Sequence, residues 1–381
     1  MNGVLMELGF LRRLRESDLW HRVGWIFGTS AGALAGTMAA LDRLDELEDF
    51  LLSLRPEETF RPNRLWRLPL LGLHEYALPE TIARRVGDLA ELAGELREAE
   101  IELVVIATDA TPGSRDAEDV RDYELVYSSR ETEPKEMVQA ILASAAISAL
   151  VMPVRVGDRL ATDGGWVRNF PLGHAYERSG VEMIVAFRYL PKFAELGAEG
   201  VVRLRSRLER FRRVPPIRAF IAELREAEAR HERGEPVHLP EMILRLTRAA
   251  IVRNTVLEEQ VADDRERFIG EVKSLRHDFA GLIDRHVSRR DEREQLAEAL
   301  EDRFSASRFA HHYGRAIPRV TVRASVSEVS LEPGYRDQKP WTEESKRVLI
   351  DRGYDLTDRE LRAAGVGILS EPLPPKATSR R

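Results

Sequence analysis

Short apolar runs alternate with longer amphipathic segments through the first half of this 381-residue chain. The runs predict buried strands, and the segments between them have the residue spacing of helices. We expect strands over 25–27, 101–108, 123–127 and 182–188, and helices over 33–40 and 136–150. Strands that alternate with helices predict an α/β fold, with a mainly parallel sheet sandwiched by helices.

The pattern changes after residue 190, where Arg, Glu, Leu and Ala dominate with helical spacing. An apolar run over 319–324 then predicts a returning strand. A closing helix is expected over 341–354. We therefore divide the chain into an α/β domain (1–190), a helical insertion (191–310), a segment that completes the α/β domain (311–370) and a disordered tail (371–381).

Candidate chemistry begins directly after the first predicted strand, with the sequence Gly28-Thr29-Ser30-Ala31-Gly32. A strand, a sharp turn centred on a serine and then a helix form the setting of a nucleophile elbow. Glycines suit this turn because side chains there would collide with the flanking strand and helix. The alternative is that Ser30 only caps the helix.

A second motif, Asp163-Gly164-Gly165, follows an A-S-x-A-I segment at 143–147 and precedes an N-x-P turn at 169–171. With these motifs in this order, the chain resembles the patatin-like phospholipases from about Gly3 to Phe187. The resemblance implies a catalytic domain over 1–190 that cleaves fatty-acyl esters of lipids. It implies that Ser30 is the nucleophile and Asp163 its general base. Spacing alone favours Asp163 as a turn residue between two strands, whereas the A-S-x-A-I and N-x-P segments around it favour the catalytic role.

A serine hydroxyl needs a base to take its proton, and a lone aspartate serves only within about 2.6–3.2 Å of it. An α/β-hydrolase would instead use a Ser-Asp-His triad. Its elbow follows several strands, whereas Ser30 lies too near the start of the chain for that arrangement. Of the candidate histidines, His174 begins a helical stretch after the turn at 169–171, and His311 and His312 lie in a polar connector.

The resemblance also implies a G-G-G-x-x-G loop whose backbone N–H groups stabilise the oxyanion. Here Gly3 aligns with the last glycine of that loop and Gly9 with a glycine inside the first helix, whereas the preceding strand and glycines are absent. We expect Ala31, and with it Gly3, to supply oxyanion donors. We also expect a truncated gene model of an active lineage. The alternative is a catalytically impaired lipid- or protein-binding relative that has lost the loop.

The composition of the chain excludes several functional classes of protein. A net charge of −6 does not favour nucleic-acid binding, and the absence of cysteine excludes disulfides and thiol chemistry. No apolar run is long enough for a transmembrane segment, and the start lacks a signal-peptide pattern. We expect a cytoplasmic enzyme with no cofactor and no metal, since no cluster of ligands has metal-binding spacing.

Three further segments carry weaker hypotheses. Asp109 follows a predicted strand and either approaches the substrate or ends the strand with a turn. Apolar residues over 60–76 form either a lid for an acyl chain or a satellite core. A basic stretch predicts peripheral contact with anionic lipid, or else a solvated face; its arginines are Arg203, Arg205, Arg207, Arg210, Arg212, Arg213 and Arg218.

Overall fold

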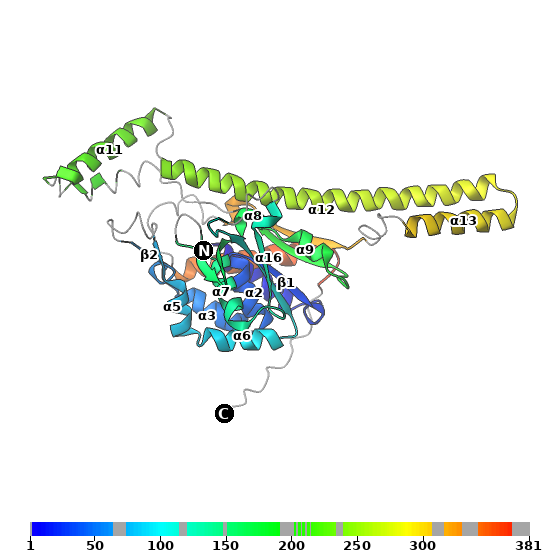
Figure 1. Ribbon diagram of the computed structural model, residues 1–381, viewed down its shortest axis with the longest axis horizontal. Helices are drawn as coiled ribbons and strands as arrows, with labels where there is room; N and C mark the ends of the chain where they lie inside the picture. The colour runs from blue at the N-terminus through cyan, green and yellow to red at the C-terminus, as the bar shows by residue number, and fades with distance from the viewer. Residues whose placement is uncertain are drawn as a thin grey trace, which may run out of the picture.

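The computed structural model describes residues 2–63, 74–113, 120–147, 151–190, 202, 205–206, 208–209, 212–213, 215–233, 239–306, 316–329 and 342–367. Within these residues the chain has an α/β fold, which confirms the fold class expected from the sequence. A compact α/β body carries a long helix across one side (Figure 1).

The main sheet is mixed, and within the described residues it has five strands. They are β1 (Trp25–Thr29), β4 (Glu102–Asp109), β5 (Glu124–Ser128), β6 (Val154–Val156) and β7 (Arg159–Asp163). The β1–β4 pair at its centre is parallel, while β5 and β7 run antiparallel to β4 and β6 antiparallel to β7. The predicted strands at 25–27, 101–108 and 123–127 are therefore confirmed, with small shifts at their ends.

Two smaller pairs complete the described strands. One is a short antiparallel hairpin of β2 (Phe60–Pro62) and β3 (His74–Tyr76). The other is a parallel pair of β8 (Ile184–Tyr189) and β9 (Arg319–Ala324), which confirms both predicted strands. The second pair brings the end of the chain back to the α/β body after the long helical segment.

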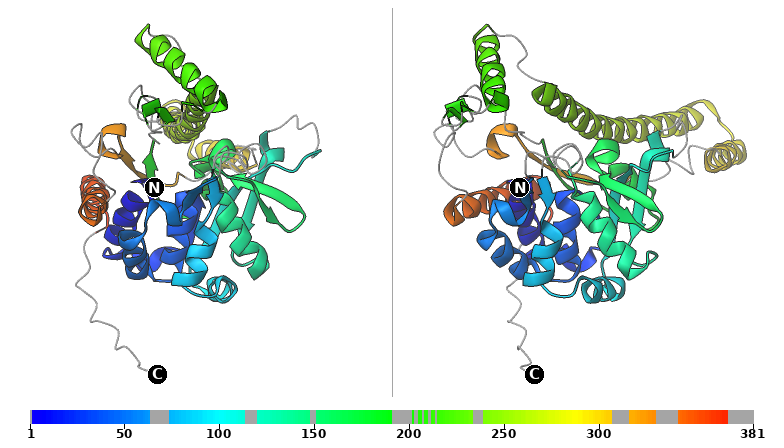
Figure 2. Two further views of the ribbon diagram at one scale, coloured as in Figure 1. Left: turned by 90° about the vertical axis from the view of Figure 1, so that its left-hand side faces the viewer. Right: turned by 60° about the vertical axis from the view of Figure 1, so that its left-hand side comes forward.

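Helices that precede and follow β4 in the chain surround the sheet of the α/β body (Figures 1 and 2). Those before β4 are α1 (Asn2–Arg15), α2 (Ala31–Ala40), α3 (Leu44–Ser53), α5 (Leu78–Arg85) and α6 (Leu89–Glu98). Those after it are α7 (Pro134–Ser144), α8 (Gly165–Arg168), α9 (Leu172–Glu177), α15 (Val326–Val329) and α16 (Glu343–Ala363).

Two apolar clusters hold these helices to the strands. One joins α1, α3 and α16 with β9, through residues such as Leu5, Val322 and Leu349. The other joins α6 and α7 to β4, through Leu96 and Met137 packed near Leu103. Because α2 contributes alanines to both clusters, the segment after Ser30 is anchored on two sides.

Helix α1 crosses α16 at very short range. A Cβ added at Gly9 would lie 1.9 Å from the carbonyl oxygen of Ile350, and one at Gly353 would lie 2.1 Å from that of Met6. Backbone cannot yield in the way a flexible side chain can, so both positions require glycine. This contact fixes α1, and with it the N-terminal turn that faces the site described below.

The helix predicted over 136–150 is partly wrong, because α7 ends at Ser144. The carbonyl of Ala146 accepts hydrogen bonds from Asp163 N at 3.0 Å and from Thr162 Oγ1 at 2.8 Å. A carbonyl used in this way by a strand is not available to the helix, so the helix stops before it.

The long segment between β8 and β9 is helical where it is described. It contains α11 (Pro215–Glu232), α12 (Leu239–His286) and α13 (Arg290–Ser305). The buried Glu259 of α12 pairs with Arg188 of β8 and Arg323 of β9, each at 2.7 Å. The rest of α12 extends beyond the α/β body together with α13, where Arg276 pairs with Glu301 (Figures 1 and 2).

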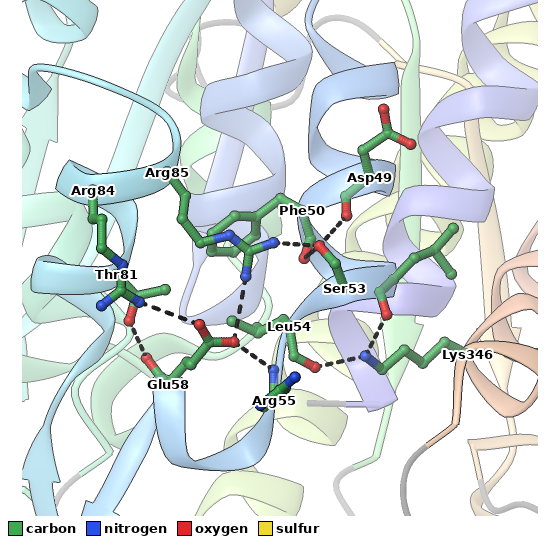
Figure 3. A network of polar contacts seen from close by, with 11 residues as sticks. Asp49, Phe50, Ser53, Leu54, Arg55, Glu58, Thr81, Arg84, Arg85 and Lys346 are labelled. Carbon is green, nitrogen blue, oxygen red and sulfur yellow. Dashed lines mark hydrogen bonds and ion pairs between the residues drawn. The ribbon is translucent and has the colours of Figure 1, made fainter.

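A buried lysine ties α16 to the end of α3. Figure 3 shows Lys346 beside a polar network around Glu58, in which Arg84 and Arg85 also take part. Its Nζ donates to the carbonyl oxygens of Leu52 at 2.8 Å and Leu54 at 2.6 Å. These carbonyls lie at the C-terminal end of α3, where the helix offers them no N–H donor. The ammonium group of Lys346 therefore caps that end of the helix.

Replacing Lys346 with methionine is expected to lower the free energy of unfolding by about 2–4 kcal/mol, because two buried carbonyls lose a charged donor. Denaturant unfolding of the variant measures this. The matched control is Lys135→Met, since Lys135 is exposed on α7 and should change stability by less than about 0.5 kcal/mol. Equal effects of the two substitutions would contradict the capping role.

Candidate active site

The turn between β1 and α2 has the geometry of a nucleophile elbow. Ser30 has φ 56° and ψ −120°, a backbone conformation that is rare for a residue with a side chain. Such strain costs about 1–3 kcal/mol and is found most often at functional sites. A Cβ at Gly28 would lie 2.6 Å from the carbonyl oxygen of Gly32, so the tight turn needs the first glycine. Ser30 itself remains partly exposed.

The sheet register brings the two predicted catalytic residues together. Strand β1 ends with Thr29 opposite Ile106 of β4, and β7 ends with Asp163 opposite Ala107, the next residue of β4. Strand β5 pairs with the other edge of β4 along this stretch, so β1 and β7 meet end to end on one edge. Ser30 Oγ donates a hydrogen bond of 2.6 Å to Asp163 Oδ2.

The carboxylate of Asp163 is held in a buried position. It is 7% exposed, and its Oδ1 accepts a hydrogen bond from Gly165 N at 2.7 Å. Burial raises the pKa of Asp163 to about 6, although the hydrogen bonds from Ser30 and Gly165 act in the opposite direction. A Cβ at Gly164 would lie 2.3 Å from the carbonyl oxygen of Ile106, so only glycine fits after Asp163.

The side chain of Ser144 holds the backbone of the elbow in place. The sequence indicated Ser144 only as part of the A-S-x-A-I segment. Its side chain is fully buried at the end of α7. Ser144 Oγ donates to the carbonyl oxygen of Ile106 at 2.6 Å and accepts from Ser30 N at 2.8 Å. One hydroxyl therefore fixes the backbone of Ser30 to β4.

We expect Ser144→Ala to reduce turnover roughly 10- to 100-fold, because small displacements of a reacting group have effects of this size. Ser129→Ala is the matched control, since this buried hydroxyl accepts from Leu103 N away from the elbow. Both variants should lose about 1–3 kcal/mol of stability. Equal turnover in the two variants would contradict a positioning role for Ser144.

Two tyrosines approach Asp163 from other elements. Burial and the nearby Asp163 carboxylate raise the pKa of Tyr76 and that of Tyr189. The phenol of Tyr76 donates to the carbonyl oxygen of Leu142 at 3.0 Å, so it is directed away from proton exchange with Asp163. With their pKa values raised, both phenols stay protonated at neutral pH.

Helix α12 packs across the segment that follows Asp163. Asn169 Nδ2 donates to Thr255 Oγ1 at 2.9 Å, and Asn254 Nδ2 donates to the carbonyl oxygen of Trp166. Arg168 forms ion pairs with Glu124 of β5 and Glu258 of α12. The same Arg168 offers its carbonyl oxygen to Thr29 Oγ1 at 2.9 Å. The insertion thus supports both motifs, which its composition did not indicate.

The structure gives no support to a histidine triad in the described residues. His174 Nε2 lies 2.9 Å from Glu124 Oε1, in the ion-pair group of Arg168. The hydroxyl of Ser30 instead donates to Asp163. His311 and His312 lie outside the described residues.

Asp109 fits the turn interpretation. It ends β4, is 5% exposed, and its carboxylate pairs with Arg159 at 2.9 Å and accepts from Thr111 N at 2.8 Å.

The central part of the predicted lid, residues 64–73, lies outside the described residues; Phe60 and Tyr76 at its ends stack with ring centroids 6.0 Å apart.

The predicted oxyanion donors lie at two helix N-termini. Ala31 is the first residue of α2, so its N–H has no acceptor within the helix. Gly3 lies in the first turn of α1, with the ring of Tyr189 against it. Their role in binding an oxyanion stays a prediction.

The described part of the chain lacks both a metal-ligand cluster and a membrane-spanning helix. It holds no group of three or more His, Cys, Asp or Glu side chains able to bind a metal ion. Among the helices described, none is long and apolar enough to cross a bilayer.

Comparison with known families agrees with this geometry. The family model described as patatin-like phospholipase matches residues 2–176, a range that includes α1, the elbow and Asp163. This segment is a patatin-like phospholipase domain. The family comprises lipid acyl hydrolases, so the resemblance noted from the two motifs is confirmed. No curated protein sequence matches the chain. Beyond residue 176, residues of β8, β9 and α16 join the apolar cluster that contains α1.

Proposed function

We propose that this patatin-like domain hydrolyses fatty-acyl esters of lipids, phospholipids included, through an acyl intermediate on Ser30. The observation that carries the proposal is the 2.6 Å hydrogen bond from Ser30 Oγ to Asp163 Oδ2 at a strained, partly exposed elbow. With a pKa of about 6, Asp163 is ionised near neutral pH and can accept the hydroxyl proton.

In the first half-reaction, Ser30 Oγ attacks the ester carbonyl carbon while its proton passes to Asp163 Oδ2. The carbonyl oxygen becomes an oxyanion, which the N–H of Ala31 stabilises together with that of Gly3. When the carbonyl re-forms, the bond to the alcohol oxygen breaks. Asp163 returns the proton to that oxygen, and the acyl group stays on Ser30.

In the second half-reaction, a water molecule takes the place of the alcohol. Asp163 accepts a proton from the water as its oxygen attacks the acyl carbon. Collapse of the second tetrahedral intermediate breaks the bond to Ser30 Oγ, which regains the proton from Asp163. The fatty acid leaves and the starting state is restored, so no cofactor or oxidant is consumed.

Release of fatty acid from phospholipid vesicles tests the proposal. The full chain is expected to release fatty acid and free the lyso-lipid, whereas the Ser30→Ala variant should remain at background. A wild type no faster than Ser30→Ala on both vesicles and soluble esters would contradict it, and would favour a binding role for the domain instead.

The basic stretch at 203–218 forms part of the proposal as a peripheral membrane contact. Arg212, Arg213 and Arg218 are exposed, with Arg212 at 3.9 Å from Glu209, and Phe220 of α11 is 41% exposed. Arg205 is instead paired with Glu228 at 2.7 Å, while Arg203, Arg207 and Arg210 lie outside the described residues. Exposed cations and an exposed apolar side chain suit an anionic bilayer surface.

We expect binding to anionic vesicles to weaken as salt rises through about 0.15 M, where the Debye length is about 8 Å. The double reversal Arg212→Glu/Arg213→Glu should weaken it further and leave soluble-ester turnover unchanged. Arg289→Glu/Arg290→Glu, at the exposed start of α13, is the matched control. Equal binding to neutral and anionic vesicles, measured by sedimentation, would contradict this contact.

A further inference from the structure

Glu7 is an acidic residue in a helix segment that is otherwise apolar and buried. The residues around it are Val4, Leu5, Met6, Leu8 and Phe10, all at most 8% exposed. Its Oε2 is buried and has no hydrogen-bond partner in the described part of the chain. Buried polar atoms almost always have a partner, so this carboxyl calls for an explanation.

Glu7 lies near the residues that follow Ser30 in the elbow. Gly3 and Glu7 are four residues apart and therefore share one face of α1. On this face, a Cβ at Gly3 would lie 2.4 Å from Tyr189 Oη. A Cβ at Gly32 would lie 3.7 Å from Glu7 Oε1, and Gly32 is only two residues after Ser30. The carboxyl of Glu7 is therefore directed at the first turn of α2.

Glu7 and Asp163 both act on the same buried phenol, that of Tyr189. Burial raises the pKa of Glu7 to about 8. Besides burial, both carboxylates raise the pKa of Tyr189, so each lies near that phenol. At a pH between about 6 and about 8, Asp163 is therefore ionised and Glu7 is neutral.

Within the described residues, the arginines of α1 are paired with acids other than Glu7. Arg12 pairs with Glu48 of α3 at 2.6 Å, and Arg13 pairs with Asp358 of α16 at 2.7 Å. Both pairs lie beyond Gly9, at the far end of the helix. From β8 the group near Glu7 is the neutral phenol of Tyr189, which Asp163 of β7 also approaches.

We infer that Glu7 is a further residue of the reaction centre: its protonated carboxyl donates a hydrogen bond to the ester bound at Ser30, and its ionisation lowers turnover. The inference rests on the proposed function. A neutral acid supplies a donor where the ester oxygen becomes negative. An ionised Glu7 would remove that donor and oppose the negative charge that develops on the ester oxygen.

The test is the pH dependence of kcat for a soluble ester in wild type and Glu7→Gln. Glutamine keeps the shape and an N–H donor but cannot ionise. Wild-type kcat should fall about tenfold between about pH 7 and pH 9, the change expected across a pKa of about 8. In Glu7→Gln the ratio of kcat at pH 9 to kcat at pH 7 should be about tenfold higher. Glu98→Gln, an exposed acid on α6, is the matched control and should keep the wild-type profile.

Glu7→Leu separates donation from packing, because leucine fills the site without a donor. We expect its kcat to fall about 10²-fold with little change in KM, since the hydrogen bond strengthens in the transition state. An alkaline limb that persists in Glu7→Gln, or equal kcat in the Gln and Leu variants, would overturn the role of Glu7 while leaving the proposed function intact. A wild type no faster than Ser30→Ala would overturn the proposed function, and this inference with it.

Discussion

Replacing Ser30 with alanine, or Asp163 with asparagine, is expected to lower kcat for a soluble ester by about 10⁴-fold or more, as loss of a nucleophile or its base does in serine hydrolases. The reason is the direct contact between the two side chains. Ser30 Oγ donates to Asp163 Oδ2 at 2.6 Å, so this hydroxyl has a carboxylate as its proton acceptor. The measurement is steady-state release of p-nitrophenol by each purified variant.

Two controls make the result specific to the chemistry. The far-ultraviolet circular dichroism of both variants should match that of wild type, since neither substitution removes packed volume. The double variant should be no slower than the slower single variant, because the two residues act as one unit. Turnover within about tenfold of wild type in either single variant would contradict the proposed roles.

The raised pKa of Asp163 predicts opposite effects on activity and stability. Turnover needs the ionised carboxylate, so kcat/KM should rise about tenfold per pH unit below about pH 6 and level above it. The folded-state pKa of about 6 lies above the unfolded value of 3.8. Stability from this group is therefore complete below pH 3.8 and is lost as the pH rises through 6.

Asp163→Asn should accordingly become more stable than wild type as the pH rises. The difference in free energy of unfolding should grow by about 3 kcal/mol between about pH 4 and pH 8, since a pKa shift of one unit corresponds to 1.36 kcal/mol. Denaturant unfolding at several pH values measures it. A difference that is constant over this range would show that burial does not raise the pKa of Asp163.

The sequence was sufficient for the parts of this site that depend on local patterns. The apolar run at Trp25 and the glycine-flanked Ser30 predicted a strand, turn and helix, which the structure contains. The strand over 101–108 was predicted for a similar reason, because β4 is buried on both faces and reads as a continuous apolar run. Register was not accessible in this way. That β1 and β7 meet end to end on β4 depends on pairing between distant segments.

The supporting residues were missed because their signals are weak or non-local. Ser144 is one small residue among alanines, and its contacts to Ser30 and Ile106 exist only in the folded chain. The contact of α12 with Trp166 and Asn169 uses polar side chains, whereas helical periodicity detects only apolar faces. Glu7 did leave a signal: it is a single acid within an apolar helical run.

The central claim is that Ser30 carries the acyl group with Asp163 as its base, and a fluorophosphonate probe tests it most directly. Attack by Ser30 Oγ on phosphorus releases fluoride and leaves a stable adduct, whose site peptide mass spectrometry identifies. We predict one adduct per chain, on Ser30, absent in Ser30→Ala and formed at least about 10³-fold more slowly in Asp163→Asn. An adduct on another residue, or ester hydrolysis that continues after Ser30 is fully labelled, would contradict the account.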